Sequence, residues 1–158
     1  MRRLAGLGLP AAMAVLALVL WVGPYRHMEL WTGDVITDIP VYQQSSDATA
    51  SGQLPYRDVA LEYPPGAAAL FWVARFMPGG YAQGFMALMA IAWALATAGA
   101  VLAAAAVGYR RWRQIAVGLV MAATPLLLGS LVATRFDAVV TALMAWVIVA
   151  AVTERWRA

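Results

Sequence analysis

The chain has 158 residues, of which 63% are hydrophobic and 12% are charged, and its mean hydropathy is +0.73. A soluble domain is typically about 45–50% apolar and about 25% charged, and one of this size could not hide so much apolar surface, so we expect a membrane protein. The net charge of +3 does not indicate nucleic-acid binding, because the arginines punctuate apolar runs. The lack of Cys and the single His exclude disulfides, thiolate metal sites and a multi-histidine metal site.

The first predicted membrane span covers residues 4–23 and follows two arginines. Twenty helical residues, at about 1.5 Å each, cross the roughly 30 Å hydrocarbon core of a bilayer. A cleaved signal peptide is the competing interpretation. The run is longer than the usual h-region of about 7–15 residues, no A-x-A site follows it, and Pro24 stands where a cleaved product would begin. We therefore expect a retained anchor.

Residues 24–80 form a long polar loop between apolar runs, and most of the acidic residues lie in it. Thr37 or Asp38 can cap a short helix in this loop, with Pro40 tolerated in its first turn. The body of that helix is expected over residues 41–50, and Gly52 can end it. A polar loop that concentrates carboxylates beside a membrane is a candidate functional segment.

A second short helix is expected over residues 66–77. Pro64-Pro65 precedes it, and Pro78-Gly79-Gly80 ends it. The helix is too short to cross a bilayer, so we expect it to lie in the interface or to dip into the membrane and return. Its one charged residue, Arg75, could snorkel to lipid head groups or contact a lipid phosphate.

Three further apolar runs predict spans over residues 82–108, 115–133 and 138–153, the second with a kink near Pro125. With four spans, one side carries seven arginines and one acid, a charge of +6, and the other carries four arginines and seven acids, a charge of −3. The positive-inside rule makes the first side cytoplasmic, with both termini inside and the loop outside.

The predicted fold class is therefore all-α, with residues 1–158 as a single membrane domain of about four spans and short extracytoplasmic helices. All eleven basic residues are Arg and Ala is abundant, which suggests a GC-rich bacterial genome. The expected location is the bacterial cytoplasmic (inner) membrane, crossed several times, with the functional loop outside.

Asp38 and Tyr42 are four positions apart and share a face if the local helix forms. Free N–H groups at a helix N-terminus stabilise a carboxylate, which suits a proton acceptor or a metal ligand. The alternative is that Asp38 only caps the helix. Asp34, four residues earlier, is a second candidate for the same role.

A second polar cluster consists of Tyr56, Arg57, Asp58, Glu62 and Tyr63. Arg57 could hold a phosphate through paired N–H donors, or it could form an ion pair with Asp58 or Glu62.

Arg135 and Asp137 lie at the edge of a predicted span, where charges are costly unless they are paired or face a polar cavity. Thr134 with Asp137 fits a helix-capping pattern, and Asp137 could also pair with Arg135. The alternative is that these residues form one wall of an active site.

Three blocks, in this order, resemble the first outer loop of bacterial polytopic glycosyltransferases: Thr37-Asp38-Ile39-Pro40-Val41-Tyr42, Gly52-Gln53-Leu54-Pro55-Tyr56-Arg57-Asp58-Val59 and Glu62-Tyr63-Pro64-Pro65-Gly66. Arg135-Phe136-Asp137-Ala138 is similar to a step before a later span. The chain most resembles glycosyltransferase family 87, the polyprenol-phosphate-mannose-dependent mannosyltransferases of the GT-C class. Members of that class usually have eight or more spans, so the resemblance covers the N-terminal part of the family. The chain could be a fragment, the product of a truncated reading frame, or one part of a split enzyme.

The resemblance implies a hexosyltransferase of the cell envelope. It would move a sugar, mannose by this family, from a polyprenyl-phosphate donor to a hydroxyl of a glycan or glycolipid at the outer face, with inversion. Asp38 would be the base, with Asp34 as the second candidate. The substrate-binding residues would be Tyr42, Tyr56, Arg57, Asp58, Glu62, Tyr63, Arg75, Arg135 and Asp137, with Arg57, Arg75 and Arg135 on the phosphate side.

The carboxylates could share a divalent cation, although the sequence requires no metal and no other cofactor. Further expected partners are membrane lipid and a chain that supplies the missing spans. The alternatives are a noncatalytic membrane subunit or lipid-binding fragment, and a small transporter. A transporter would place ionisable residues inside its spans, whereas the charges here lie in loops and at span edges.

Overall fold

The computed structural model describes residues 6–27 and 37–153, and this part of the chain is built from helices. The elements are α1 (Gly8–His27), α3 (Ile39–Ala50), α4 (Pro65–Val73), the 3₁₀ turn η1 (Ala74–Phe76), α5 (Tyr81–Ala106), α6 (Arg111–Leu128), α7 (Ser130–Thr134) and α8 (Asp137–Val152). Within these ranges the sole extended pairing is an isolated bridge between Pro55 and Val59. The all-α prediction is confirmed for the described residues.

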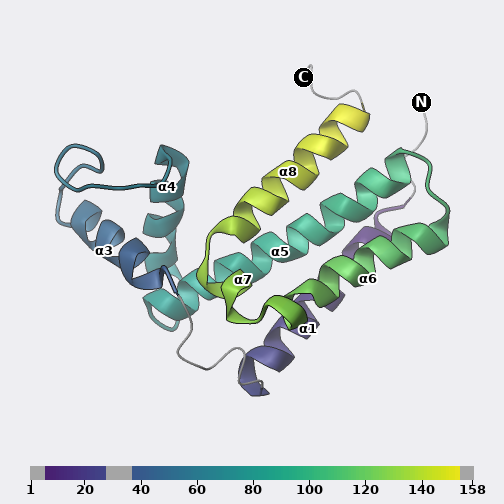
Figure 1. Cartoon of the computed structure of the whole chain (residues 1–158), viewed down its shortest axis with the longest axis horizontal. Coiled ribbons are helices and arrows are strands. Elements are labelled where there is room, and N and C mark those ends of the chain that lie inside the picture. The colour runs from purple at the N-terminus through teal and green to yellow at the C-terminus, as the bar shows by residue number, and fades with distance from the viewer. Residues whose placement is uncertain (1–5, 28–36, 154–158) are drawn as a thin grey trace.

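Helix α5 is the element against which the other long helices pack: α8, α1 and α6 all contact it (Figure 1). Consecutive long helices run in alternating directions. The start of α1, the turn from α5 to α6 and the end of α8 therefore lie toward one end of the bundle. Helices α3 and α4 form a separate pair beyond the other end, beside the start of α5 (Figure 1).

Small residues and indole hydrogen bonds hold the bundle together. A Cβ added at Gly99 in α5 would lie 2.9 Å from the Cβ of Ala145 in α8, so the glycine permits close approach of the two helices. The Trp146 indole of α8 donates to the carbonyl of Leu95 at 3.1 Å. The Trp93 indole of α5 donates to the carbonyl of Met121 in α6 at 2.8 Å, so two neighbours are tied to the central helix.

Helix α5 has 26 residues, with a mean hydropathy of 2.1 in its most apolar window. It is the one helix in the described part of the chain that is both long and apolar enough to cross a membrane. Two shorter helices, Gly8–Val22 of α1 and α8, are also apolar. The structure thus gives one candidate membrane-spanning helix, and the arrangement with four spans stays a prediction.

The predicted span over residues 115–133 is divided in the structure. Helix α6 starts at Arg111, continues through Pro125 and ends at Leu128, and Gly129 has a φ of +59° that a helix cannot continue through. The short helix α7 follows. The interruption therefore lies at Gly129, four residues beyond the proline where the sequence predicted a kink.

The ends of the short helices α3 and α4 agree closely with the sequence prediction. Helix α3 has Pro40 in its first turn and ends at Ala50, and Gly52 follows with a φ of +87°. The helix expected over residues 66–77 forms as α4 and η1 together, and Gly79, with a φ of +96°, follows it. The first helix differs, because α1 continues past the predicted end of the span to His27.

Candidate active site

The carboxylate of Asp38 lies where three separate segments of the chain meet. The Tyr63 hydroxyl donates to its Oδ2 at 3.1 Å, and the Tyr42 hydroxyl donates to the same oxygen at 3.3 Å. On the other side, Nη2 of Arg135 lies 3.7 Å from Oδ1. The Asp38 side chain keeps 25% of its surface exposed, so a ligand can reach it from solvent.

Asp38 is the residue before α3, but its carboxylate does not cap that helix within the described structure. The Ile39 N–H donates to the Thr37 hydroxyl at 3.2 Å instead. The capping interpretation of Asp38 is therefore wrong. Its carboxylate is instead held by side chains from the loop before α4 and from the junction of α7 and α8.

A cluster of aromatic rings positions these groups. Tyr42 is fully buried, and its ring stacks on Phe71 of α4 at 4.2 Å and lies 4.9 Å from Phe85 of α5. The ring of Tyr63 meets Tyr42 edge-on at 5.2 Å and Phe136 edge-on at 5.4 Å. Because the rings come from five segments, this aromatic cluster fixes α3 and α4 to the bundle beside Asp38.

Burial and the Tyr63 side chain both raise the pKa of Tyr42 well above its usual range, and the charge of Asp38 acts in the same direction. The phenol therefore stays protonated at physiological pH and serves as a donor to the carboxylate.

The contact between Arg135 and Asp38 leaves other donors of the guanidinium unused. The 3.7 Å between Nη2 of Arg135 and Oδ1 of Asp38 exceeds the roughly 2.7–2.9 Å of a close charge-assisted hydrogen bond. The Nε of Arg135 is buried and, among the described residues, has no hydrogen-bond partner; the same holds for the hydroxyls of Ser130 and Thr134. A buried donor without a hydrogen-bond partner lowers the stability of the fold by about 1–3 kcal/mol. A ligand or a water molecule usually supplies the missing hydrogen bond.

The local pairing predicted for the Thr134–Asp137 segment is wrong. Helix α8 begins at Asp137 after Phe136, and within the described chain neither Thr134 nor Asp137 caps it. Arg135 forms its ion pair with Asp38 instead of Asp137. The alternative interpretation of this segment as a wall beside the carboxylate fits the geometry better.

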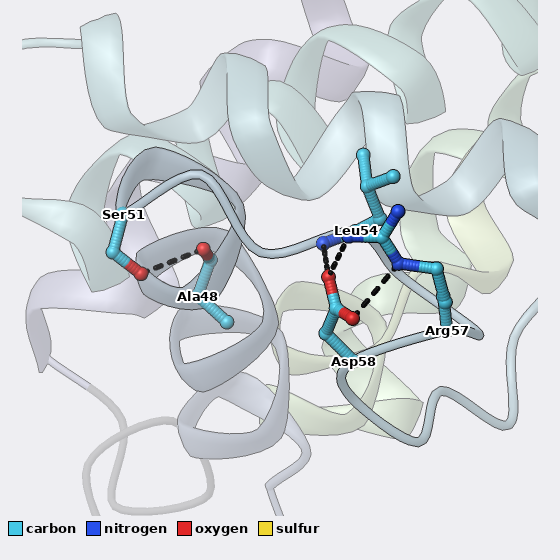
Figure 2. Close-up of polar contacts among 5 residues, drawn as sticks. All are labelled: Ala48, Ser51, Leu54, Arg57 and Asp58. Atoms are coloured by element: carbon cyan, nitrogen blue, oxygen red, sulfur yellow. Dashed lines mark hydrogen bonds and ion pairs between the residues drawn. The ribbon is translucent and has the colours of Figure 1, made fainter.

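Arg57 and Asp58 form a compact ion pair in the loop after α3. The Arg57 Nε lies 2.9 Å from Oδ1 and its Nη2 lies 2.8 Å from Oδ2, while the Leu54 N–H donates to Oδ2 at 2.9 Å (Figure 2). The guanidinium and the Leu54 N–H hold the pKa of Asp58 below its usual range, and Asp58 raises the pKa of Arg57. The ion-pair interpretation of Arg57 is confirmed, and its role is to close this loop.

Of two other candidate residues, Tyr56 supports the site and Arg75 lies apart from it. Tyr56 has a φ of +68°, and its hydroxyl donates to the carbonyl of Tyr63 at 2.5 Å, so it fixes the segment that carries the Tyr63 phenol. Arg75 forms an ion pair with Asp47 of α3 and thereby ties η1 to that helix.

The structure thus brings Asp38, Tyr42, Tyr63 and Arg135 together. Glu62 and Asp137 are exposed, and Asp34 lies outside the described residues. Among the side chains that the structure describes, in residues 6–22 and 37–153, there is no group of three or more acidic or histidine residues that could hold a metal ion. Sequence reasoning missed the Ser130 hydroxyl, because a serine within an apolar run gives no signal of an unpaired buried hydroxyl.

Comparison of the chain with models of protein families, with curated proteins and with solved structures finds no match.

Proposed function

We propose that the chain is a membrane glycosyltransferase, or the N-terminal part of one, as its resemblance to glycosyltransferase family 87 implies. The donor is a sugar, mannose by that resemblance, on a polyprenyl phosphate, and the acceptor is a hydroxyl of a glycan or glycolipid. The observation that carries the proposal is the partly exposed Asp38 carboxylate, oriented by two tyrosines, beside the Arg135 guanidinium, whose Nε has no partner among the described residues.

The two carboxylate oxygens are suited to different tasks. Both tyrosine hydroxyls donate to Oδ2, which fixes the orientation of the group. Oδ1 has only the distant Arg135 beside it in the described structure, and it can accept the proton of an acceptor hydroxyl. A general base placed in this way typically contributes about 10²–10⁴-fold to a rate.

In the proposed reaction, the acceptor oxygen attacks the anomeric carbon from the face opposite the phosphate, and its proton passes to Asp38. The bond between the anomeric carbon and the phosphate oxygen breaks, and polyprenyl phosphate leaves with the bonding electron pair. Inversion follows from this geometry. Arg135 stabilises the developing negative charge, since its side chain is 38% exposed and its guanidinium donors can reach a phosphate oxygen.

The proposed membrane arrangement has four spans, α1, α5, α6 and α8, in a bacterial inner membrane. It is supported by the alternating helix directions in Figure 1 and by the cluster Arg110, Arg111 and Arg113 at the turn from α5 to α6. Large apolar side chains are exposed on α1, α6 and α8, which suits contact with lipid or with further spans; they include Val19, Val120, Leu127, Leu143 and Val147. The α3–α4 pair and Asp38 then lie at the extracytoplasmic end.

The test is a transfer assay. The chain is reconstituted together with any membrane partner that co-purifies with it, and transfer of labelled mannose from polyprenyl phosphate to a mannoside acceptor is measured. Asp38→Asn is expected to lower transfer at least about 100-fold while the protein still inserts and folds. Arg135→Gln is expected to weaken the binding of the polyprenyl-phosphate donor. Glu154→Gln, at the predicted cytoplasmic side, is the matched carboxylate-to-amide control and retains activity. Equal activity of the Asp38→Asn variant contradicts the proposal, and donor binding without transfer by the wild type indicates the noncatalytic alternative.

A further inference from the structure

An open groove of about 540 Å³ lies between α3 and the loop that follows it. Its lining includes Pro40, Gln43, Gln44, Asp47, Gln53 and Val59. The helix residues in this lining belong to the exposed face of α3, whereas Tyr42, Ser45 and Ser46 are buried on the opposite face. The groove is therefore separate from the cluster of side chains around Asp38, although both include the first turn of the same helix.

Hydrogen bonds within the chain hold the loop wall of this groove in place. The Asp58 carboxylate accepts from the Leu54 N–H and pairs with Arg57, as Figure 2 shows, and Pro55 bridges to Val59. At the end of α3 the Ser51 hydroxyl donates to the carbonyl of Ala48 at 2.8 Å. A groove whose walls are already ordered loses little conformational entropy when a ligand binds.

The glutamine side chains in the groove are available to a ligand, whereas Asp47 pairs with Arg75. The side-chain amides of Gln43, Gln44 and Gln53 make no hydrogen bond within the described part of the chain. Each amide offers two donors and one acceptor oxygen, which matches neighbouring sugar hydroxyls that both donate and accept. The described lining residues include no cation, which disfavours a phosphate ligand, and Pro40 and Val59 supply small apolar surfaces.

The groove is elongated. Its lining follows α3 from Pro40 to Ser51, a rise of roughly 16 Å at about 1.5 Å per residue. We infer that this groove binds a neutral oligosaccharide of several sugar units, and that this oligosaccharide is the body of the acceptor. The naming of the ligand as an acceptor rests on the proposed function; the binding itself does not.

The glutamines provide a direct test, because the chain contains five of them and no Asn. The side-chain amide region of a ¹⁵N spectrum of the chain in micelles therefore holds five pairs of signals. Three pairs come from the groove, and Gln83 and Gln114 serve as internal controls. Linear mannotetraose is titrated as the probe, and methyl mannoside is the single-sugar comparison.

Saturable shifts of the three groove amides with mannotetraose, weaker with methyl mannoside and absent at the two control amides, are the expected result. A double variant, Gln43→Ala with Gln53→Ala, should weaken binding about tenfold, since each lost hydrogen bond contributes about 0.5–1.5 kcal/mol. Both side chains are exposed, so the variant is expected to fold. Unshifted groove amides, equal shifts at all five, or unchanged affinity of the double variant would overturn the inference.

The outcome is separable from that of the transfer assay. If Asp38-dependent transfer occurs but mannotetraose does not shift the groove amides, the groove inference fails and the proposed function stands. If mannotetraose binds in the groove but no sugar is transferred, the groove inference is supported and the proposed function fails.

Discussion

The ion pair between Asp38 and Arg135 is one of the contacts that join the segment around α3 to the α7–α8 junction, and a double-mutant cycle can measure it. The variants are Asp38→Asn, Arg135→Gln and the two combined. At the observed separation of 3.7 Å, two unit charges attract by about 1 kcal/mol in a water-like dielectric and by about 4.5 kcal/mol at an effective dielectric of 20. The two side chains are 25% and 38% exposed, so solvent screening favours the lower value. We therefore expect a coupling free energy of about 1 kcal/mol.

The assay is the free energy of unfolding of the four proteins in mixed micelles, titrated with denaturing detergent at low and at high salt. The coupling should fall as salt increases, because both groups are partly exposed. A second cycle with Asp137→Asn and Arg135→Gln is the matched control, and it should give no coupling. Mutations at independent sites add to within about 0.3–0.5 kcal/mol. A coupling free energy below about 0.3 kcal/mol between Asp38 and Arg135 would therefore refute the contact between them.

Three further measurements test the packing and the loop. Gly99→Ala should destabilise the bundle by about 1–3 kcal/mol, because its Cβ meets α8, whereas Gly66→Ala, with open space around it, should be neutral or stabilising by up to about 1 kcal/mol in the same unfolding assay. Tyr42→Ala should cost about 3–5 kcal/mol and Tyr42→Phe only about 1 kcal/mol, since the second keeps the stacked ring; equal losses would contradict this assignment. The pKa of Asp58 is lowered by Arg57 and the Leu54 N–H, so this contact is present above the unfolded value near 4 and is lost as pH falls through the lower folded value. The protection of the Leu54 amide from hydrogen exchange, taken relative to its intrinsic rate at each pH, should therefore fall only in that acidic range.

Features that depend on a few neighbouring residues could be predicted from the sequence. Pro40 and Gly52 set the start and the end of α3, because proline is tolerated in a first helical turn and glycine accepts a positive φ. The pair of Arg57 and Asp58 was also predictable, since adjacent charges in a loop can meet without help from the rest of the fold.

Features that depend on packing between distant segments were predicted only in outline. The polar loop and the Thr134–Asp137 segment were expected to meet on the outer side, and the pair of Arg135 and Asp38 confirms that they lie together. The aromatic cluster that brings the α7–α8 junction against α3 was not predicted, and the sequence offered Asp137 as the nearer partner of Arg135. Arg75 likewise meets Asp47 only once η1 and α3 lie side by side. The break at Gly129 was missed because the apolar pattern continues across it, although a glycine after a helical run is a local signal for an end.

The sequence predicted the local geometry of Asp38 in the candidate site, but not all of the side chains that surround it. Asp38 and Tyr42 were expected to share a face and do so, but the carboxylate is held by Tyr63 and Arg135 instead of capping a helix. The assignment of the site to sugar transfer stays a prediction.

The most direct measurement is single-turnover transfer of labelled mannose from polyprenyl phosphate by the reconstituted wild type, Asp38→Asn and Asp38→Glu. We expect product from the wild type, a loss of at least about 100-fold in the amide variant, and partial recovery when the carboxylate is restored on a longer side chain. Equal product from the wild type and the amide variant, with both proteins folded, would contradict a catalytic role for this carboxylate.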